Sequence, residues 1–339
     1  MAINATAYSP KQFQFLIAEQ DDWGTFNPDS GGSPDLSWVA VDVDSIGSPT
    51  FNVNQVLDVR TGSRIVQATD FFHDNKSKVI EMSASGTATT EVLDMLLTNI
   101  TSDTSAPYSV GSSAGSQTFT SATTNQTDIQ IFSIAYNSPS SGNTLAFKDC
   151  FCTSLTLNGD QGTEGGRIKF SATFKTGSLP EELTDGQLTA DTTISANNYF
   201  MNGWAAAHRQ ILDVANVLVN SFSLNVENDM VFAGATSTGY ELATRVGEIS
   251  ATADFSIKYD ANTDQMFKTY EAQTSGISQG AVLMNDASSI TDAKFGFKFS
   301  KSVMTDISFN EGDMMMLDVF VKAVGTGIGS GAALFEIGC

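Results

Sequence analysis

The chain has 339 residues, of which 41% are hydrophobic and only 16% charged, a balance that favours strands and turns over exposed amphipathic helices. Its 17 Lys and Arg against 38 Asp and Glu give a net charge of -21, which excludes a protein that gathers phosphate over its whole surface. No apolar run reaches the ~18 residues of a membrane span, and three cysteines are too few for a disulfide framework. We therefore expect a soluble protein of a reducing cytoplasm, without a signal peptide.

The first half of the chain carries the signals of a β-rich domain with one helix. Residues 51–55 alternate as in a strand, and residues 79–100 predict a strand followed by a short helix. Residues 145–177 predict a hairpin, because two Phe-rich alternating runs flank a turn rich in Gly and Asn.

The second half repeats this order. Residues 222–228 alternate, residues 247–272 predict a strand and a short helix, and residues 293–324 predict another Phe-rich hairpin. Two occurrences of one order of elements predict an internal duplication. If the halves superpose, Phe170 and Val319 should occupy matching core positions.

The expected fold class is all-β, a sandwich or barrel with one short flanking helix per domain. We predict a first β domain at residues 1–178 with an N-terminal arm, a polar linker at 179–197, and a second β domain at 198–339 with a Gly-rich tail. Residues 198–219 suit either a helix or a strand.

The long predicted loop at residues 58–78 has both basic and apolar side chains. Loops of this length without regular structure are commonly functional. We predict that it docks on another molecule, although it could instead fold back onto its own domain. The residues singled out for docking are Arg60, Arg64, Phe71, Phe72 and Lys76.

The cysteine pair at Cys150 and Cys152 is expected to be structural. In a strand we expect the two side chains to point to opposite faces, so that they do not share a metal. Zinc takes four ligands, and the chain offers only two histidines besides its three cysteines.

Other motifs are weak. Ser113 lies in a Gly-x-Ser-x-Gly stretch, but a Ser/Thr-rich loop follows where a hydrolase elbow needs a helix. Asp42, Asp44 and Gly47 lack the Glu that closes a calcium loop. The glycines at 325–331 lack dinucleotide-binding spacing and predict a flexible tail. We expect no catalytic, cofactor or metal site, and hence not an enzyme.

Three stretches, taken in order, resemble the major tail tube proteins of long-tailed bacteriophages. Residues 147–177 are similar to that family's strand pair, with Asp149 where the family pattern has Gly. Residues 221–228, followed by 247–259, are similar to two further strands of the family. Residues 19–27 (EQDDWGTFN) resemble its opening motif.

The resemblance implies a structural virion protein in duplicated-domain form, whose sheets join between copies into a cylinder. Three chains would make a ring of pseudo-sixfold symmetry, and rings would stack into a conduit for DNA ejection. The implied partners are other copies, tail terminator, tape-measure and baseplate proteins, and DNA in transit without specific binding. The implied location is the virion tail, assembled in the host cytoplasm.

A conduit for DNA should have an acidic lumen, because Lys and Arg contacts give non-specific affinity for phosphate. Asp254 and Asp318 are the acids that we predict for this lumen. Each alternates with core residues, so its carboxylate faces away from the core, toward either the lumen or the outer surface. The alternatives are another phage tail or virion component, such as a terminator, baseplate hub or decoration protein, or a carbohydrate-binding adhesin. An insert at residues 108–126 departs from the family pattern.

Overall fold

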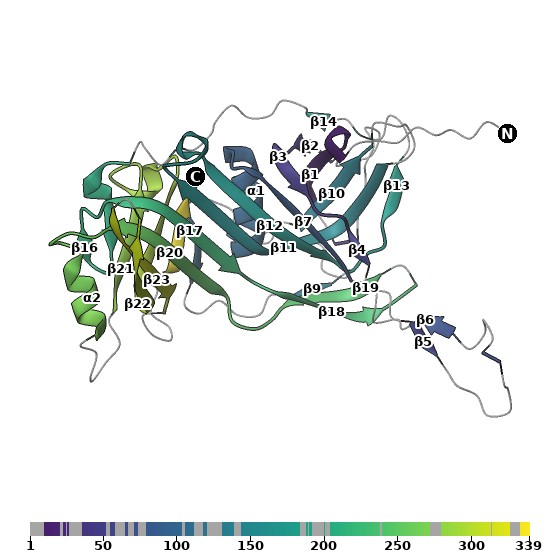
Figure 1. Ribbon diagram of the computed structural model, residues 1–339. Helices are drawn as coiled ribbons and strands as arrows, with labels where there is room; N and C mark the ends of the chain where they lie inside the picture. The colour runs from purple at the N-terminus through teal and green to yellow at the C-terminus, as the bar shows by residue number, and fades with distance from the viewer. Residues whose placement is uncertain are drawn as a thin grey trace.

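A computed structural model gives the fold (Figure 1), and most of the residues that it describes lie in strands. The described residues are 10–20, 23–24, 26, 36–51, 55–57, 65–66, 71–73, 79–103, 106–111, 118–120, 131–138, 144–183, 188, 190–191, 200, 204–237, 239–271, 279–312, 314–325 and 333–339. The predicted all-β class with few helices is confirmed. No helix in this part of the chain is long and apolar enough to cross a lipid bilayer.

The first half contains one α-helix among antiparallel strands. Its elements are β1 (Gln14–Gln20), β2 (Trp38–Ala40), β3 (Val43–Ile46), β4 (Thr50–Phe51), β5 (Gln55–Leu57), β6 (Phe71–His73), β7 (Ile80–Thr87), α1 (Thr90–Thr101), β8 (Tyr108–Gly111), β9 (Thr118–Thr120), β10 (Ile131–Asn137), β11 (Thr144–Asp160), β12 (Ile168–Thr176), β13 (Glu181–Leu183) and β14 (Ala190–Asp191).

The second half likewise has one α-helix among its strands. They are β15 (Arg209–Ile211), β16 (Val214–Ala215), β17 (Val219–Glu227), β18 (Met230–Ala235), β19 (Tyr240–Arg245), β20 (Ser250–Lys258), α2 (Asp264–Glu271), β21 (Gln279–Asn285), β22 (Gly296–Glu311), β23 (Met315–Ala323) and β24 (Ala333–Gly338). Both predicted hairpins are present, as β11–β12 and β22–β23.

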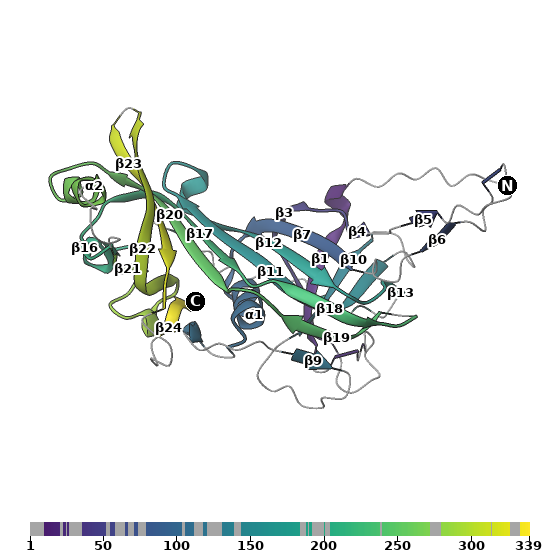
Figure 2. The ribbon, with the colours of Figure 1, turned by 90° about the horizontal axis from the view of Figure 1, so that it is seen from below.

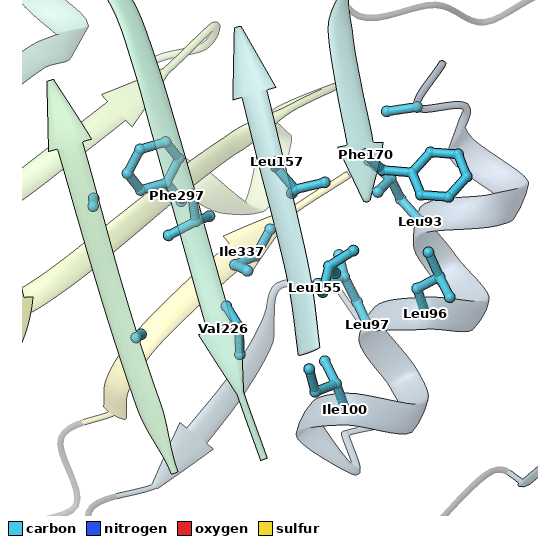
Figure 3. Close-up of a cluster of buried hydrophobic side chains, with 14 of the residues drawn as sticks. Leu93, Leu96, Leu97, Ile100, Leu155, Leu157, Phe170, Val226, Phe297 and Ile337 are labelled. Atoms are coloured by element: carbon cyan, nitrogen blue, oxygen red, sulfur yellow. The ribbon is translucent and has the colours of Figure 1, made fainter. Parts of the chain in front are cut away.

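Helix α1 covers the core face of the first hairpin. Its apolar residues recur at helical spacing, so that one face is buried and the other is solvated. It ends at Ser102, whose φ of 60° is left-handed and whose N–H is donated to the Thr98 carbonyl. Figure 3 shows side chains from this helix against those of β11 and β12, and the same cluster continues to Val226 and Ile337 of the second half.

One run of eight strands spans both halves. Consecutive pairings give the order β3, β7, β12, β11, β17, β20, β23 and β22, all antiparallel. The junction is the β11–β17 pair, in which Ser154 to Asp160 lie opposite Glu227 to Ser221. In Figures 1 and 2 the two halves therefore lie side by side along a shared sheet.

The two halves match strand for strand. In each, a hairpin (β11–β12 or β22–β23) is flanked on one side by β7 or β20 and on the other by β10 or β21. Strand β3 next to β7 corresponds to β17 next to β20. The helices α1 and α2 follow the corresponding strands β7 and β20.

Three β-bulges also fall at corresponding positions. The first interrupts β11–β12 between Cys152 and Ser154, and β22–β23 between Met304 and Asp306. The second interrupts β10–β11 after Phe132 and β21–β22 after Gly280. The third lies in β3–β7 between Val43 and Ser45, and in β17–β20 between Val219 and Ser221. Bulges re-aim strands and increase their twist, so both halves bend at the same places.

This register corrects one sequence expectation. Aligning the bulges places Ala172 with Val319 and Phe170 with Leu317, so Phe170 and Val319 are not equivalent. All of these positions except the small Ala172 carry bulky apolar side chains, so the residue types alone do not show which of them are equivalent. The correspondence is what an internal duplication predicts, and the duplication itself stays a prediction.

The boundary between the halves is less simple than a linker. Part of the expected linker forms β13, which pairs with β11, and β14, which pairs with β2. The ambiguous segment 198–219 contributes a short 3-10 turn (Ala206–His208), β15, β16 and the first residue of β17 rather than a long helix. From the 108–126 insert, β8 pairs with β24 and β9 with β19, so first-half residues extend sheets of the second half.

Candidate functional site

The face of the eight-strand run opposite the core is mostly polar across both halves, although Met316 and Phe320 of β23 also lie on it. Directly paired residues share a face, so each row of partners can be followed from strand to strand. One row, for example, leads from Ser171 through Thr156 and Asn225 to Thr252. The small polar residues of this face are Ser83, Ser85, Ser154, Thr156, Asn158, Ser171, Thr173, Ser221, Ser223, Asn225, Thr252, Ser256, Ser308 and Asn310. We call this surface the polar face.

Four lysines that these strands present on the polar face lie near a carboxylate. Lys169 contacts Asp44 at 2.9 Å and Lys322 contacts Glu248 at 3.1 Å. The other two pairs are Lys175 with Asp229 at 2.7 Å and Lys258 with Asp260 at 3.8 Å. Exposed ion pairs add little stability, but they neutralise the cations that would otherwise hold phosphate.

The predicted lumen acids, Asp254 and Asp318, both lie on this polar face. Asp254 is exposed on β20 opposite Phe320, and desolvation by the neighbouring strands raises the pKa of its carboxyl. Asp318 on β23 is half-buried opposite Ser256 and accepts a hydrogen bond from Asn310 Nδ2 at 3.0 Å. Within the described residues, neither carboxylate has a lysine or arginine partner. Their role in a lumen stays a prediction.

The predicted docking loop is described only in part. Phe71 and Phe72 lie in β6, which pairs with β5 in a separate two-stranded sheet that stands apart from the rest of the molecule (Figure 1). Ile65 and Val66 are exposed by 76% and 57% of their surface. The basic residues Arg60, Arg64 and Lys76 lie outside the described residues.

Asp149 organises a buried network that connects distant stretches of the first half. Its carboxylate accepts hydrogen bonds at 2.7 Å from Gln20 Nε2, the Gly24 N–H and Ser178 Oγ. Its backbone φ is 54°, in the left-handed region that Gly, Asn and Asp tolerate best. A Gly would suit the same backbone, but only Asp supplies these acceptors.

Arg245 joins the two halves from inside. Its guanidinium donates to the Cys152 carbonyl at 2.9 Å and the Asn99 carbonyl at 2.8 Å, both in the first half, and to the Asn228 carbonyl in the second. It also lies 5.7 Å from the centre of the Phe151 ring, a cation–π contact. Burial lowers the pKa of Arg245 to about 10, so the side chain remains charged at neutral pH.

The cysteine expectation is wrong in its geometry. Cys150 and Cys152 both lie in the main core, and Phe151 between them packs in a separate cluster on the other face, because residues two apart in a strand share a face. Burial raises the pKa of all three thiols, that of Cys152 and of Cys339 to about 12.

The remaining motifs of the sequence show little that chemistry could use. Ser113 lies outside the described residues, as does most of its Gly-rich stretch. Within the part of the chain that is described, no three His, Cys, Asp or Glu side chains are grouped to hold a metal ion. The Gly-rich tail precedes β24, in which Phe335 and Ile337 are buried.

Neither Asp149 nor Arg245 was predicted from the sequence to be a functional residue. Asp149 had a signal, since it stands where the strand-pair pattern that residues 147–177 resemble has Gly. Arg245 had a signal as well, because it lies two residues after Ala243 in an alternating strand and therefore shares the face of that buried residue. Comparison with known proteins gave no match, either to a protein-family model or to a curated protein.

Proposed function

We propose that the chain is a structural subunit of the major tail tube kind, which polymerises into stacked rings around a conduit for DNA and catalyses no reaction. The proposed ring contains three chains with pseudo-sixfold symmetry, and its partners are further copies together with terminator, tape-measure and baseplate proteins of a virion tail. The observation that carries the proposal is the polar face, which is continuous across both halves and on which four lysines are paired with carboxylates.

The polar face has the chemistry that a DNA conduit needs. Non-specific affinity for DNA comes mainly from Lys and Arg contacts to phosphate, each of which releases counterions. On this face four lysines are neutralised, while Asp254 and Asp318 repel phosphate at short range. Small Ser, Thr and Asn side chains form much of this surface and solvate it.

Matching strands and bulges in both halves support the ring geometry. A chain whose halves have the same pairing and the same bends contributes two similar segments to a ring. Three chains then give six similar segments.

Negative-stain electron microscopy of the purified full-length protein tests the proposal. We expect hollow tubes of uniform diameter and of no fixed length. Particles of one fixed size, or a monomer at every concentration, would overturn it. Binding to a glycan array without tubes would favour the adhesin instead.

The conduit chemistry has its own test in the polar face. Asp254→Lys together with Asp318→Lys should make the tubes retain DNA at low salt, with the effect fading as salt rises. Each new phosphate contact should steepen the dependence of log affinity on log salt by about 0.9. Glu271→Lys, on the exposed side of α2, is the control and should change neither. Equal retention by the control would show that the face has no special role.

A further inference from the structure

Each of the two strands that meet at the junction corresponds to a strand of the other half, and the equivalent edge of that strand has no partner among the described residues. At the junction, β11 pairs with β17 over Ser154 to Asp160. The bulge alignment makes Asp306 to Glu311 of β22 the counterpart of that part of β11, and β3 with β4 the counterpart of β17. Among the described residues, this part of β22 pairs only with β23, and β3 and β4 pair only with β7.

The two open edges lie at opposite ends of the eight-strand run, so they cannot meet within one chain without closing the sheet on itself. Figure 2 shows the β22–β23 hairpin extending beyond the rest of the sheet, far from β3 and β4. Unpaired edges of this kind are templates for another strand.

Exposed apolar side chains mark both edges. Phe309 on β22 is 41% exposed, whereas its counterpart Leu157 at the junction is 1% exposed. Met315 on β23 is 46% exposed, whereas its counterpart Ile168 is fully buried. The second half of the chain covers these first-half residues at the junction. Their counterparts are covered only in part, since Phe309 packs against Tyr259 and Phe267 and is still 41% exposed.

The same contrast holds on the other edge. Strand β4 pairs with β7 through Thr50 opposite Glu81 and Phe51 opposite Ile80, which makes Phe51 the counterpart of Val226. Phe51 is 47% exposed and Val226 only 1%. Apolar residues that are buried at the junction are thus exposed at both open edges.

We propose that β22 of one copy pairs antiparallel with β3 and β4 of the next copy, in the register of the β11–β17 junction. Ile307 then lies opposite Phe51 of the next copy, as Leu155 lies opposite Val226, and Ser308 lies opposite Thr50. The residues between β3 and β4 carry one extra residue relative to β7, so the pairing is interrupted there by a bulge.

The strand that pairs with the open edge of β22 comes from a second copy of the chain, because β3 and β4 of such a copy continue the apolar core in the same way as β17 does at the β11–β17 junction. The core of the junction passes from Leu155 to Val226, and the same apolar pairing is repeated at the new edge by Ile307 and Phe51. In the ring of the proposed function, this pairing is the contact between neighbouring chains. It rests on that proposal only for the closure of the chains into a ring.

A cysteine pair across the two edges tests the register. Ser308→Cys and Thr50→Cys are introduced together into full-length protein carrying Cys339→Ser, and the assembled protein is oxidised. We expect covalent multimers that dithiothreitol returns to single chains. Thr156→Cys with Asn225→Cys is the matched control, because these residues form the equivalent pair inside one chain. It should close without forming multimers.

The outcomes separate this inference from the proposed function. Tubes that form while the edge pair stays reduced, with the internal pair closed, would overturn the pairing and leave the tube proposal standing. Cross-linked multimers that never stack would support the pairing and contradict the tube. A protein that remains a single reduced chain would refute both.

A second pair of variants does not depend on disulfide geometry. Phe309→Gln should raise the concentration needed for assembly about thirtyfold, as expected when an aromatic anchor at an interface is lost. Leu145→Gln is the control, since Leu145 is 38% exposed but lies near β13, away from both edges. Unchanged assembly of the Phe309 variant, or equal loss in the control, would contradict the pairing.

Discussion

Replacing Arg245 by Met should weaken the whole molecule, because this buried side chain holds the two halves together. Methionine has a similar length and no charge, so it removes the hydrogen bonds and most of the cation–π contact while keeping much of the volume. The carbonyls of Asn99, Cys152 and Asn228 would each lose their guanidinium donor.

The expected loss is about 3 kcal/mol. A buried acceptor left unsatisfied costs about 1 kcal/mol or more, and three are affected. A buried cation also carries a desolvation cost, visible in the lowered pKa of Arg245, and removing the charge relieves that cost. The relief limits the net loss and keeps it at the lower end of the range for three orphaned acceptors.

Urea unfolding followed by tryptophan fluorescence measures this loss. Trp23 stacks on Phe151, the ring beneath Arg245, so its emission should report on the junction directly. The midpoint should fall by about 1 M urea for a slope of about 3 kcal/mol/M. Arg167→Met is the control, because Arg167 is exposed and its guanidinium lies over the Phe200 ring in the same manner. A change below about 0.5 kcal/mol in the Arg245 variant would refute the assigned role.

Three further outcomes are expected. Asp149→Ala should destabilise the chain by about 1 kcal/mol more than Asp149→Gly in urea unfolding, because Ala adds left-handed strain to the lost hydrogen bonds; equal losses would exclude strain. Burial raises the pKa of Asp254, so its ionised form costs stability above that pKa. Asp254→Asn should therefore melt at a higher temperature than the natural chain at neutral pH, and the advantage should vanish as pH falls through that pKa. Deleting residues 60–76 should leave rings that do not stack in negative-stain images, and normal tubes from that deletion would disprove docking by the loop.

Much of the fold followed from local pattern. The hairpins β11–β12 and β22–β23 were predictable because every second residue is apolar over a long stretch, and the helices because their apolar residues recur at helical spacing. The class of fold and the repeated order of elements depend on these local signals alone.

The parts that escaped prediction depend on pairing between distant residues. Strand β24 is short and follows a Gly-rich stretch, and it is buried only because β22 and β8 lie on either side of it. The polar face could be expected strand by strand, but its continuity needs the β11–β17 register, which no local pattern encodes. Arg245 is buried for the same reason, since two of its acceptors, the carbonyls of Cys152 and Asn99, come from residues about a hundred or more positions away.

The burial of the thiols affects how the folded protein responds to oxidation. Oxidation to sulfenic acid or a mixed disulfide begins with the thiolate, which is nearly absent at neutral pH when the pKa is about 12. Cys150 and Cys152 are also closed off by the core, so peroxide and glutathione disulfide do not reach them. The folded chain can therefore persist in air without disulfide exchange at Cys150 or Cys152.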